Sequence, residues 1–548
     1  MSSVQRWLLP DDWLASSRCP CLGATGHVTI IIAYGPWSYD DLRGTRLVLA
    51  RHLPEKPKHA DDLRRCSRIR ETLVRDGLFD AASHNLTDHN GGDSGDAAGV
   101  ATRWRIGLAP FSLTREQVSF FEALGAHLLA FYRALNRLYF ESLRGTQPAW
   151  VAAYLDQGKP DSLIALSRMK RFRDTLPLVI RPDVLPTEHG MAISELDSVP
   201  GGIGLTGSLS RAYGAEADDT PEQHEIVGGP DGLVIGFEAM LRHLLGAREG
   251  AIAIVVSDEA NAYRPEMSWL AARLRERGLD VSCVHPRDIQ FTEDALLLSD
   301  EQGQRPIAAL YRFFELFDLK NVPKSELVMY SAKKDRTLVT PPFKPALEEK
   351  LAFALFHHEV LRPFWQQALG EDTDALLSRL IPRTWILDPR PVPPFATIPG
   401  LRVAGRGVSD WRELAHASQK DRRFVVKPSG FSELAWGSRG VSVGHDLAQP
   451  DWAAALEAAL AAFPMTPSIL QEYHKGRQFQ LSYYDEHTDR VTPMMGRARL
   501  SPYYFVTGDR ATLAGVLATV CPPDKKVIHG MRDAVMVPCA VASARLND

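Results

Sequence analysis

The sequence predicts a protein of the mixed α/β class, and three stretches support this. Residues 251–256 form an apolar run typical of a buried strand, and residues 265–277 follow with helical spacing. Residues 281–284 then supply a second strand, which we expect to lie parallel to the first. Two charged strands at 177–183 and 191–197, separated by a turn that contains Pro and Gly, are expected to form a hairpin. The chain therefore combines helices with both parallel and antiparallel strands.

The charged hairpin is expected to bring four side chains together. Because strand side chains alternate in direction, Arg181 and Asp183 share one face of the first strand. Glu195 and Asp197 share one face of the second strand for the same reason. Three carboxylates beside one guanidinium would repel each other, and Mg²⁺ would remove that repulsion while Arg181 faced a phosphate. The competing interpretation is a solvated hairpin whose charges keep a sheet edge soluble.

Length and composition limit the class of protein. A chain of 548 residues is too long for one core, and roughly three or four domains are expected. A hydrophobic content of 45% is ordinary for a globular protein, and a net charge of −4 argues against nucleic-acid binding, with a local basic cleft left open. Asp11 and Asp12 interrupt the apolar core that a signal peptide needs, and the six cysteines form no disulfide framework. We therefore expect a cytoplasmic protein with no membrane span.

The first 105 residues carry no recognisable chemistry. We expect a strand at 27–35, a helix at 61–76 and a loop or linker at 88–99, which lacks large apolar residues. Residues 112–144 then place apolar side chains at helical intervals, with Thr114 as the expected N-cap. This stretch predicts a long amphipathic helix whose apolar face is core.

A perfect GxGxxG pattern follows the charged hairpin at Gly202, Gly204 and Gly207. A dinucleotide fingerprint needs a strand that runs directly into the glycines and an acidic residue about twenty residues further on. Pro200 and Gly201 interrupt that approach, and the next segment does not read as a crossover helix that leads to a strand. The sequence therefore argues against a dinucleotide site here.

Two features follow between the α/β stretch and the C-terminal part. A third strand is expected at 308–313, and Arg312 near its end is a candidate for gripping an anionic substrate, with an ordinary surface arginine as the alternative. Residues 345–367 are expected to form one helix, with Lys350 near its start. The histidines of that helix do not form an HExxH motif, which excludes a zinc protease there.

The C-terminal part places a lysine at the end of an apolar strand. That strand ends at Lys427, and a glycine-bearing loop runs from Ser429 and Gly430 to Arg439. A fixed cation beside such a loop can surround a polyphosphate together with backbone N–H groups. The stretch is not a Walker A motif, because no GxxxxGK[ST] occurs.

Two later strands add further polar side chains. One ends in Gln471, Glu472 and Tyr473, whose side-chain and backbone groups could contact the edge of an adenine ring. The other places Arg497 and Arg499 on one face. Each pattern also has a purely structural explanation, and it is their order along the chain that points to a family.

In that order the motifs resemble the circularly permuted ATP-grasp ligases, in particular the synthetase domain of glutathionylspermidine synthetase. The resemblance covers the chain from about residue 106 to 548 and rests on the charged hairpin, the α/β stretch, Lys350, Lys427 and the later polar strands. It implies an α/β (α+β) ATP-grasp fold in circularly permuted order, with the metal-binding strands ahead of the nucleotide lysines. The domains it implies are an N-terminal extension of unknown role at 1–105, a helical segment with the metal-binding strands at 106–250, an α/β substrate-side domain at 251–345 and the nucleotide-binding lobes at 346–548.

The resemblance also implies roles for individual residues. The ligands of two Mg²⁺ ions would be Asp183, Glu195 and Asp197. The groups that stabilise the transferred phosphoryl group would be Arg181 with Arg497 or Arg499. The contacts to ATP would come from Lys350, Lys427, Ser429, Gly430, Arg439, Gln471, Glu472 and Tyr473. The chain departs from the family in having Asp197 where asparagine is usual and in a longer loop, which puts the equivalence of Arg439 in doubt.

The function implied by the resemblance is ATP-dependent ligation of a small carboxylate to an amine through an acyl phosphate. Substrates of the amino acid, peptide or polyamine class are implied, without nucleic-acid or membrane partners, and a homodimer is left open. Two alternatives stand beside it. One is a catalytically silent nucleotide-binding or scaffold protein, and the other is a phosphotransferase that stops after phosphorylating its substrate.

Overall fold

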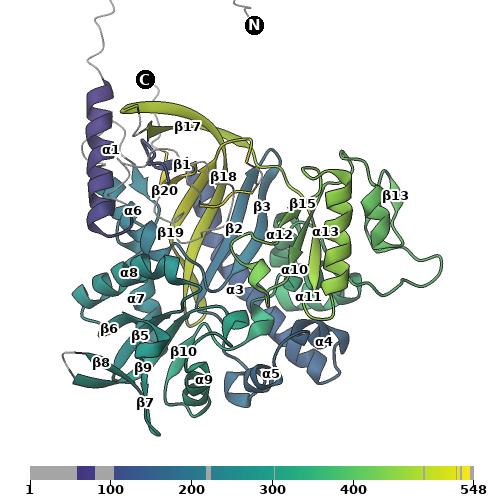
Figure 1. Cartoon of the computed structure of the whole chain (residues 1–548), viewed down its shortest axis with the longest axis horizontal. Helices are drawn as coiled ribbons and strands as arrows, with labels where there is room; N and C mark the ends of the chain where they lie inside the picture. The colour runs from purple at the N-terminus through teal and green to yellow at the C-terminus, as the bar shows by residue number, and fades with distance from the viewer. Residues whose placement is uncertain are drawn as a thin grey trace, which may run out of the picture. The chain divides into compact units, whose positions relative to one another are not determined.

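The computed structural model describes residues 58–79, 104–216, 224–300, 303–485, 488–525, 527–530 and 533–542. The strand expected at 27–35 and the loop expected at 88–99 lie outside these residues. The helix expected at 61–76 is present as α1 (Lys58–Arg75). Within the described ranges the chain has three sheets of four or more strands and one two-stranded ribbon (Figure 1). None of the helices in these ranges combines the length and the apolar character that a membrane span requires.

The largest sheet has the order β1-β20-β19-β18-β2-β3, with β17 paired to β18 and β4 paired to β20. Its strands are β1 (Phe111–Leu113), β2 (Val179–Thr187), β3 (Gly190–Asp197), β4 (Glu225–Ile226), β17 (Gln478–Asp485), β18 (Arg490–Thr507), β19 (Arg510–Cys521) and β20 (Val535–Val541). The long helix α3 (Arg115–Leu143) packs against this sheet and buries the apolar face that its sequence predicts. Thr114 caps it through a capping box with Gln117, which confirms the predicted N-cap.

The predicted charged hairpin is formed by β2 and β3. The strands pair antiparallel, with Arg181 opposite Asp197 and Asp183 opposite Glu195. The register shifts between Asp183 and Val184, so a β-bulge follows the charged pairs. The pairing that places these four side chains together is therefore confirmed.

The second sheet has the order β6-β5-β9-β8-β7, with β10 paired to β9. Its strands are β5 (Ala251–Val256), β6 (Val281–Val284), β7 (Gln290–Phe291), β8 (Leu296–Asp300), β9 (Gly303–Phe313) and β10 (Leu338–Thr340). The three predicted strands β5, β6 and β9 lie parallel, and α8 (Arg264–Glu276) connects the first two. Because β6 and β9 flank β5 on opposite sides, the carboxyl ends of β5 and β9 form the kind of edge where such sheets bind ligands.

The third sheet has the order β11-β16-β14-β15 and is antiparallel. Its strands are β11 (Thr384–Ile386), β14 (Phe424–Pro428), β15 (Ser442–Val443) and β16 (Ser468–Glu472). α13 (Gln449–Ala462) packs on it through a core that includes Trp452 and Leu456. Residues 429–441 connect β14 to β15 and are called the β14–β15 loop below. A separate ribbon consists of β12 (Arg402–Val403) and β13 (Arg406–Gly407).

The single helix expected over residues 345–367 is a wrong prediction. The structure instead has η7 (Pro345–Leu347), α10 (Leu351–His357), η8 (Glu359–Leu361) and α11 (Arg362–Leu369). His358 has an extended backbone, with φ −71° and ψ 122°, and Pro363 lies in the first turn of α11. Because proline lacks an N–H and restricts the residue before it, the helix restarts there instead of continuing. At the other end of α10, Lys350 is the N-cap residue.

The GxGxxG glycines serve helix packing at the start of α6 (Ile203–Ala215). The carboxylate of Glu266, on α8, accepts hydrogen bonds from the backbone N–H of Gly202 at 2.7 Å and of Leu205 at 2.9 Å. A Cβ on Gly204 would lie 2.1 Å from the carbonyl oxygen of Glu266. A protein carboxyl group thus occupies the helix N-terminus where a dinucleotide would place its pyrophosphate, in agreement with the argument against that site.

We expect Gly204→Ala to lower the free energy of unfolding by about 1–3 kcal/mol, since the added methyl group would collide with the main chain of α8. Gly476→Ala is the matched control, because its Cβ would meet no atom closer than 3.5 Å. Urea unfolding of the wild type and both variants measures the difference. Equal stability of all three proteins would contradict the close approach of α6 and α8.

Candidate functional site

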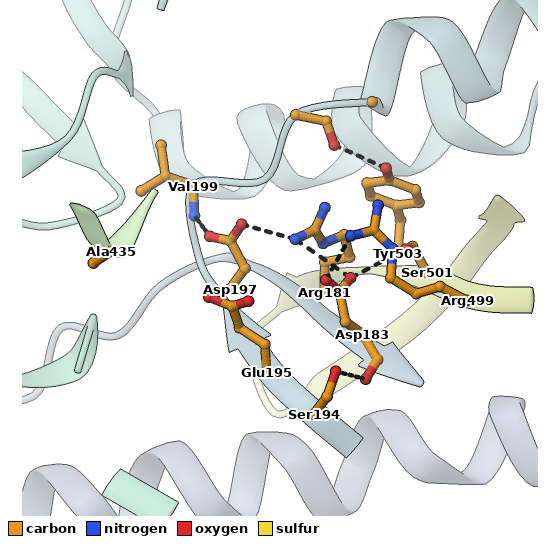
Figure 2. Close-up of polar contacts among 12 residues, drawn as sticks. Arg181, Asp183, Ser194, Glu195, Asp197, Val199, Ala435, Arg499, Ser501 and Tyr503 are labelled. Atoms are coloured by element: carbon orange, nitrogen blue, oxygen red, sulfur yellow. Dashed lines mark hydrogen bonds and ion pairs between the residues drawn. The ribbon is translucent and has the colours of Figure 1, made fainter. Parts of the chain in front are cut away.

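Lys350 lies beside the acidic hairpin although it comes from a distant part of the chain. Its Nζ is 2.7 Å from a carboxylate oxygen of Glu195, on β3. The same ammonium donates a hydrogen bond of 2.8 Å to the backbone carbonyl oxygen of Ala435. Ala435 belongs to the β14–β15 loop, and Figure 2 shows it near the end of β3 that carries Glu195 and Asp197. The start of α10 therefore meets both the hairpin and this loop.

Lys427, at the end of β14, reaches the same hairpin. Its Nζ donates to the backbone carbonyl oxygen of Ser194 at 3.0 Å and to Oε1 of Gln471 at 2.9 Å. The Gln471 amide in turn donates to the hydroxyl of Thr384 at 3.3 Å. The structure thus brings together the two predicted lysines and Gln471 next to Glu195.

Burial and neighbouring charges shift the pKa values of Glu195, Lys350 and Lys427 in different directions. Burial raises the pKa of Glu195, but Lys350 and Lys427 outweigh it and bring the pKa down to about 2. Burial lowers the pKa of Lys350, but Glu195 outweighs burial and leaves that pKa raised. For Lys427 burial prevails and, with the nearby charge of Lys350, lowers the pKa to about 8, although Glu195 opposes the shift.

Asp183 and Asp197 are each paired with a guanidinium (Figure 2). Arg181 lies 3.0 Å from a carboxylate oxygen of Asp197 and 3.4 Å from one of Asp183. Arg499, on β18, contacts Asp183 at 3.1 Å, and the hydroxyl of Ser501 donates to the same carboxylate at 3.1 Å. Asp183 is only 4% exposed, whereas Glu195 and Asp197 lie on the edge strand β3 with side chains 34% and 29% exposed. The interpretation of the hairpin as a solvated edge is therefore wrong for Asp183 and holds in part for the carboxylates of β3.

The sequence argument for a metal ion rested on three carboxylates beside one cation, and that premise is wrong. Arg499 and Lys350 also lie at the hairpin, so each carboxylate has a protein cation beside it. Within the residues that the structure describes, no group of three or more His, Cys, Asp or Glu side chains is arranged to hold a metal ion. Mg²⁺ at a nucleotide site takes only one or two carboxylates beside phosphate oxygens and water, so the assignment of Asp183, Glu195 and Asp197 to two Mg²⁺ ions stays a prediction.

The two predicted arginines of β18 lie in different surroundings. Arg499 joins the hairpin through Asp183, whereas the guanidinium of Arg497 donates to the backbone carbonyl oxygen of Pro523 at 2.5 Å. Both side chains leave the same face of the strand, as predicted from their spacing. The structure therefore places Arg499 in the charged cluster and places Arg497 against a neighbouring main-chain segment.

The predicted residues of the β14–β15 loop contact protein groups. The hydroxyl of Ser429 donates to the carboxylate of Glu349. Gly430 packs so closely on the segment before α10 that a Cβ there would lie 2.3 Å from the carbonyl oxygen of Glu348. Arg439, at the other end of the loop, forms an ion pair of 2.7 Å with Glu259. The loop thus connects α10 with the residues that follow β5.

Three residues were predicted to contact adenine: Gln471, Glu472 and Tyr473. Among these, within the residues that the structure describes, only Gln471 is hydrogen-bonded to Lys427. The backbone N–H of Glu472 donates to the carbonyl oxygen of Arg383 at 2.9 Å, and the ring of Tyr473 lies 4.4 Å from that of His445 between centroids. Burial raises the pKa of both Glu472 and Tyr473. Their contact with adenine stays a prediction.

Arg312 is not a surface arginine, since it is fully buried with 0% exposure. Its guanidinium donates to the carbonyl oxygens of Pro341, at 3.2 Å, and of Phe314, and to the carboxylate of Glu348. Burial raises the pKa of Glu348 to about 7, although Arg312 opposes the shift. The structure therefore presents Arg312 as a partner of Glu348, and a substrate contact is not proposed for it.

Sequence reasoning missed a carboxyl group at the end of β9. Glu315 follows that strand by two residues, and burial raises its pKa to about 8, with the charges of Glu348 and Asp197 adding to the shift. The available signal was its position after an apolar strand, at the sheet edge where ligands bind. Ser501 was missed as well, because a serine within a strand carries no distinguishing pattern.

No protein-family model matches the sequence, and no curated protein matches it. Among solved structures, a glutathione synthetase-like effector from Globodera pallida in its apo form matches with a TM-score of 0.50 at 12% identity, covering 88% of this chain and 97% of that chain. A second solved structure, from Methylobacillus flagellatus KT, carries the name gamma-glutamylcysteine synthetase and matches at 12% identity, covering 75% of this chain and 85% of that chain. Its TM-score of 0.35 is too low to show a shared fold. The first likeness shows that this chain shares its mixed α/β fold with that protein.

We expect Arg181→Met to lower the free energy of unfolding by about 1–3 kcal/mol, because Asp183 is buried and would lose one of its charged partners. Arg412→Met is the control, since Arg412 forms an ion pair with Glu457 in which both side chains are more than half exposed. That pair should contribute less than about 1 kcal/mol. Urea unfolding measures the free energy of unfolding of both variants. Equal losses in the two would mean that the hairpin ion pairs contribute no more to stability than an exposed pair.

Proposed function

We propose that the chain is an ATP-dependent carboxylate–amine ligase that forms an amide or peptide bond through an acyl phosphate. The observation that carries this proposal is the meeting of Lys350 and Lys427 at Glu195 and Ser194 of β3, at 2.7 and 3.0 Å. Two ammonium groups from separate elements at one acidic hairpin form a preorganised cationic pair suited to polyphosphate oxygens. The fold shared with a protein named as glutathione synthetase-like supports the same class of reaction.

We further propose that the ATP-grasp fold is circularly permuted in this chain. The acidic strands β2 and β3 precede the strands β14 and β16 that carry Lys427 and Gln471. This order agrees with the family in which the predicted metal-binding strands come before the nucleotide lysines. Lys350, placed between the two groups of strands in sequence, contacts both β3 and the β14–β15 loop.

The proposed reaction has two steps. First, the γ-phosphoryl group of ATP is transferred to a carboxylate oxygen of the substrate, and ADP leaves. The amine nitrogen then attacks the acyl carbon, the bond from that carbon to the phosphate oxygen breaks, and the nitrogen loses a proton. Because a carboxylate has no good leaving group of its own, the phosphoryl transfer is what makes the second step possible.

In this proposal Lys350 and Lys427 hold phosphate oxygens of ATP. Arg181 of the hairpin and Arg499 of β18 lie beside Asp183, where they would offset charge on the phosphoryl group during transfer. The β14–β15 loop would keep water from the acyl phosphate. Asp183, Glu195 and Asp197 would hold Mg²⁺, which would supply further charge neutralisation on the phosphate oxygens, and no step is assigned to it.

A second candidate is a nucleotide-binding protein without catalysis, and one observation favours it. Asp183, Glu195 and Asp197 are each already neutralised by an arginine or lysine of the chain. A phosphotransferase that stops after the first step is a third candidate, which the two lysines and the hairpin fit equally well. Trapping of the intermediate distinguishes all three.

We expect the protein to release ADP and form a hydroxamate when a set of amino acids, small peptides and other carboxylic acids is offered with ATP and hydroxylamine. Hydroxylamine takes the place of the unknown amine and converts an acyl phosphate into a hydroxamate, whereas an alkyl phosphate does not react. ADP release without hydroxamate would point to the phosphotransferase. ATP binding without ADP release for any of the acids would favour the silent nucleotide-binding protein.

Lys427→Ala and Glu195→Ala are the variants that assign this activity to the site. Both should lose at least a hundredfold in hydroxamate formation, since one removes a phosphate contact and the other removes the partner of Lys350. Arg412→Met, which alters an exposed ion pair, should leave the rate unchanged. Circular dichroism checks that the variants are folded, and a folded Lys427→Ala protein with wild-type turnover would refute the assignment.

We expect ATP affinity to fall as the pH rises above about 8. Burial holds the pKa of Lys427 at about 8, so below that pH its ammonium attracts the phosphate groups and above it the neutral amine does not. Lys427→Arg keeps its charge across this range and should flatten the decline. Isothermal titration calorimetry with ATP between pH 7 and pH 9.5 measures the affinity of the wild type and of Lys427→Arg. A wild-type affinity that is constant over this range would contradict the prediction.

A further inference from the structure

A buried ion pair lies next to the predicted site and involves a lysine that no motif singles out. Nζ of Lys159 is 2.5 Å from Oε1 of Glu349, and the two side chains are 0% and 2% exposed. Lys159 lies between the short helices α4 (Trp150–Asp156) and α5 (Asp161–Ser167). Buried ion pairs contribute little net stability, because their attraction must first offset the loss of hydration. Stability alone therefore does not explain this pair.

Glu349 connects the elements that carry the two site lysines. It directly precedes Lys350, and its other carboxylate oxygen accepts a hydrogen bond from the hydroxyl of Ser429. That hydroxyl accepts a hydrogen bond of 2.9 Å from the backbone N–H of Leu351, the first residue of α10. Ser429 follows Lys427 by two residues, so a movement at Glu349 would displace both lysines.

The next two loop residues are held by the same cluster. A Cβ on Gly430 would lie 2.3 Å from the carbonyl oxygen of Glu348 and 3.2 Å from Cα of Glu349, so the two main chains are in direct contact. Nζ of Lys159 lies 5.8 Å from the centre of the Phe431 ring, within the range of a cation–π contact. Three consecutive residues at the start of the β14–β15 loop are thus fixed by Lys159 and residues 348–349.

The far end of this loop is held in a different way. Arg439 pairs with Glu259 through side chains that are 39% and 32% exposed. An ion pair open to water separates at little cost in free energy, whereas a buried pair does not. The loop returns to β14 at Gly440 and at β15, so both of its ends are fixed, and the ion pair of Arg439 is the exposed contact that can be released between them.

We infer that Lys159 and Glu349 are positioning residues that fix the start of the β14–β15 loop and so set the spacing between Lys350 and Lys427. This inference rests on the proposed ATP site. Residues 429–431 stay fixed when the exposed ion pair of Arg439 opens, and Lys427 and Lys350, which adjoin the buried contacts of Ser429 and Glu349, keep their places. Displacement of a catalytic group by about 1 Å can cost a hundredfold in rate, so rigid contacts at this point matter for function.

The test is the double variant Lys159→Met/Glu349→Met, which removes both buried charges and keeps similar volumes. Hydrogen exchange of the amides in residues 430–440 should accelerate at least tenfold, and the KM for ATP should rise at least tenfold with a smaller change in kcat. Arg412→Met/Glu457→Met removes an exposed pair and should change neither value. Lys159→Arg, which can restore the ion pair, should keep loop exchange within threefold of the wild type.

A folded double variant whose loop exchange equals that of the wild type would overturn the inference. Should the double variant not fold, Ser429→Ala removes the loop hydroxyl alone, and the same faster exchange confined to residues 430–440 is expected. Wild-type exchange in that variant would also overturn the inference. A wild-type protein without ATP turnover would refute the proposed function instead, and loop exchange in the same variants would still decide whether Lys159 and Glu349 fix the loop.

Discussion

The ion pair between Glu195 and Lys350 is the constraint on which the arrangement of the site depends. Lys350 belongs to a segment, residues 348–350, in which three consecutive charged side chains each reach a different part of the chain. Glu348 contacts Arg312 of the second sheet, Glu349 contacts Lys159, and Lys350 contacts Glu195 of the largest sheet. Because a buried charge without a partner is costly, each pair fixes the element that supplies its partner. This short segment therefore aligns the sheets that form the site.

The two lysines at the hairpin show how local surroundings give one residue type two behaviours. Lys350 lies against a carboxylate, which raises its pKa, while Lys427 is held by neutral oxygen atoms and has its pKa lowered to about 8. Lys427 therefore gains more than Lys350 from an arriving anion, since its present partners compensate its charge only in part. Glu195 is the group that makes the difference, because it lies closer to Lys350.

How much could be predicted from the sequence depended on how local each signal is. The strands β5 and β6 and the charged hairpin were predicted because their signals are local: runs of apolar residues, alternation of side chains along a strand, and turn residues next to each other in sequence. The helix over 345–367 was wrong because its apolar spacing continues past His358, and the break depends on Pro363 and on packing. The metal argument counted charges within the hairpin alone, and no sequence rule could show that Arg499 and Lys350 join it. Lys159 was not predicted as a functional residue because a single lysine before a proline matches no sequence motif.

The segment that follows β3 links the acidic hairpin to the GxGxxG glycines at the start of α6. The carboxylate of Asp197 accepts a hydrogen bond of 2.8 Å from the backbone N–H of Val199, and the Tyr503 hydroxyl donates to the carbonyl oxygen of Gly201 at 2.8 Å (Figure 2). Glu266 then caps the start of α6 with a carboxyl group whose pKa burial raises to about 7. The helix N-terminus, which elsewhere attracts phosphate, is used here by the chain itself. The segment after β3 is thereby fixed to α8 and β18, and an anion at the hairpin would find the N-terminus of α6 already used by Glu266.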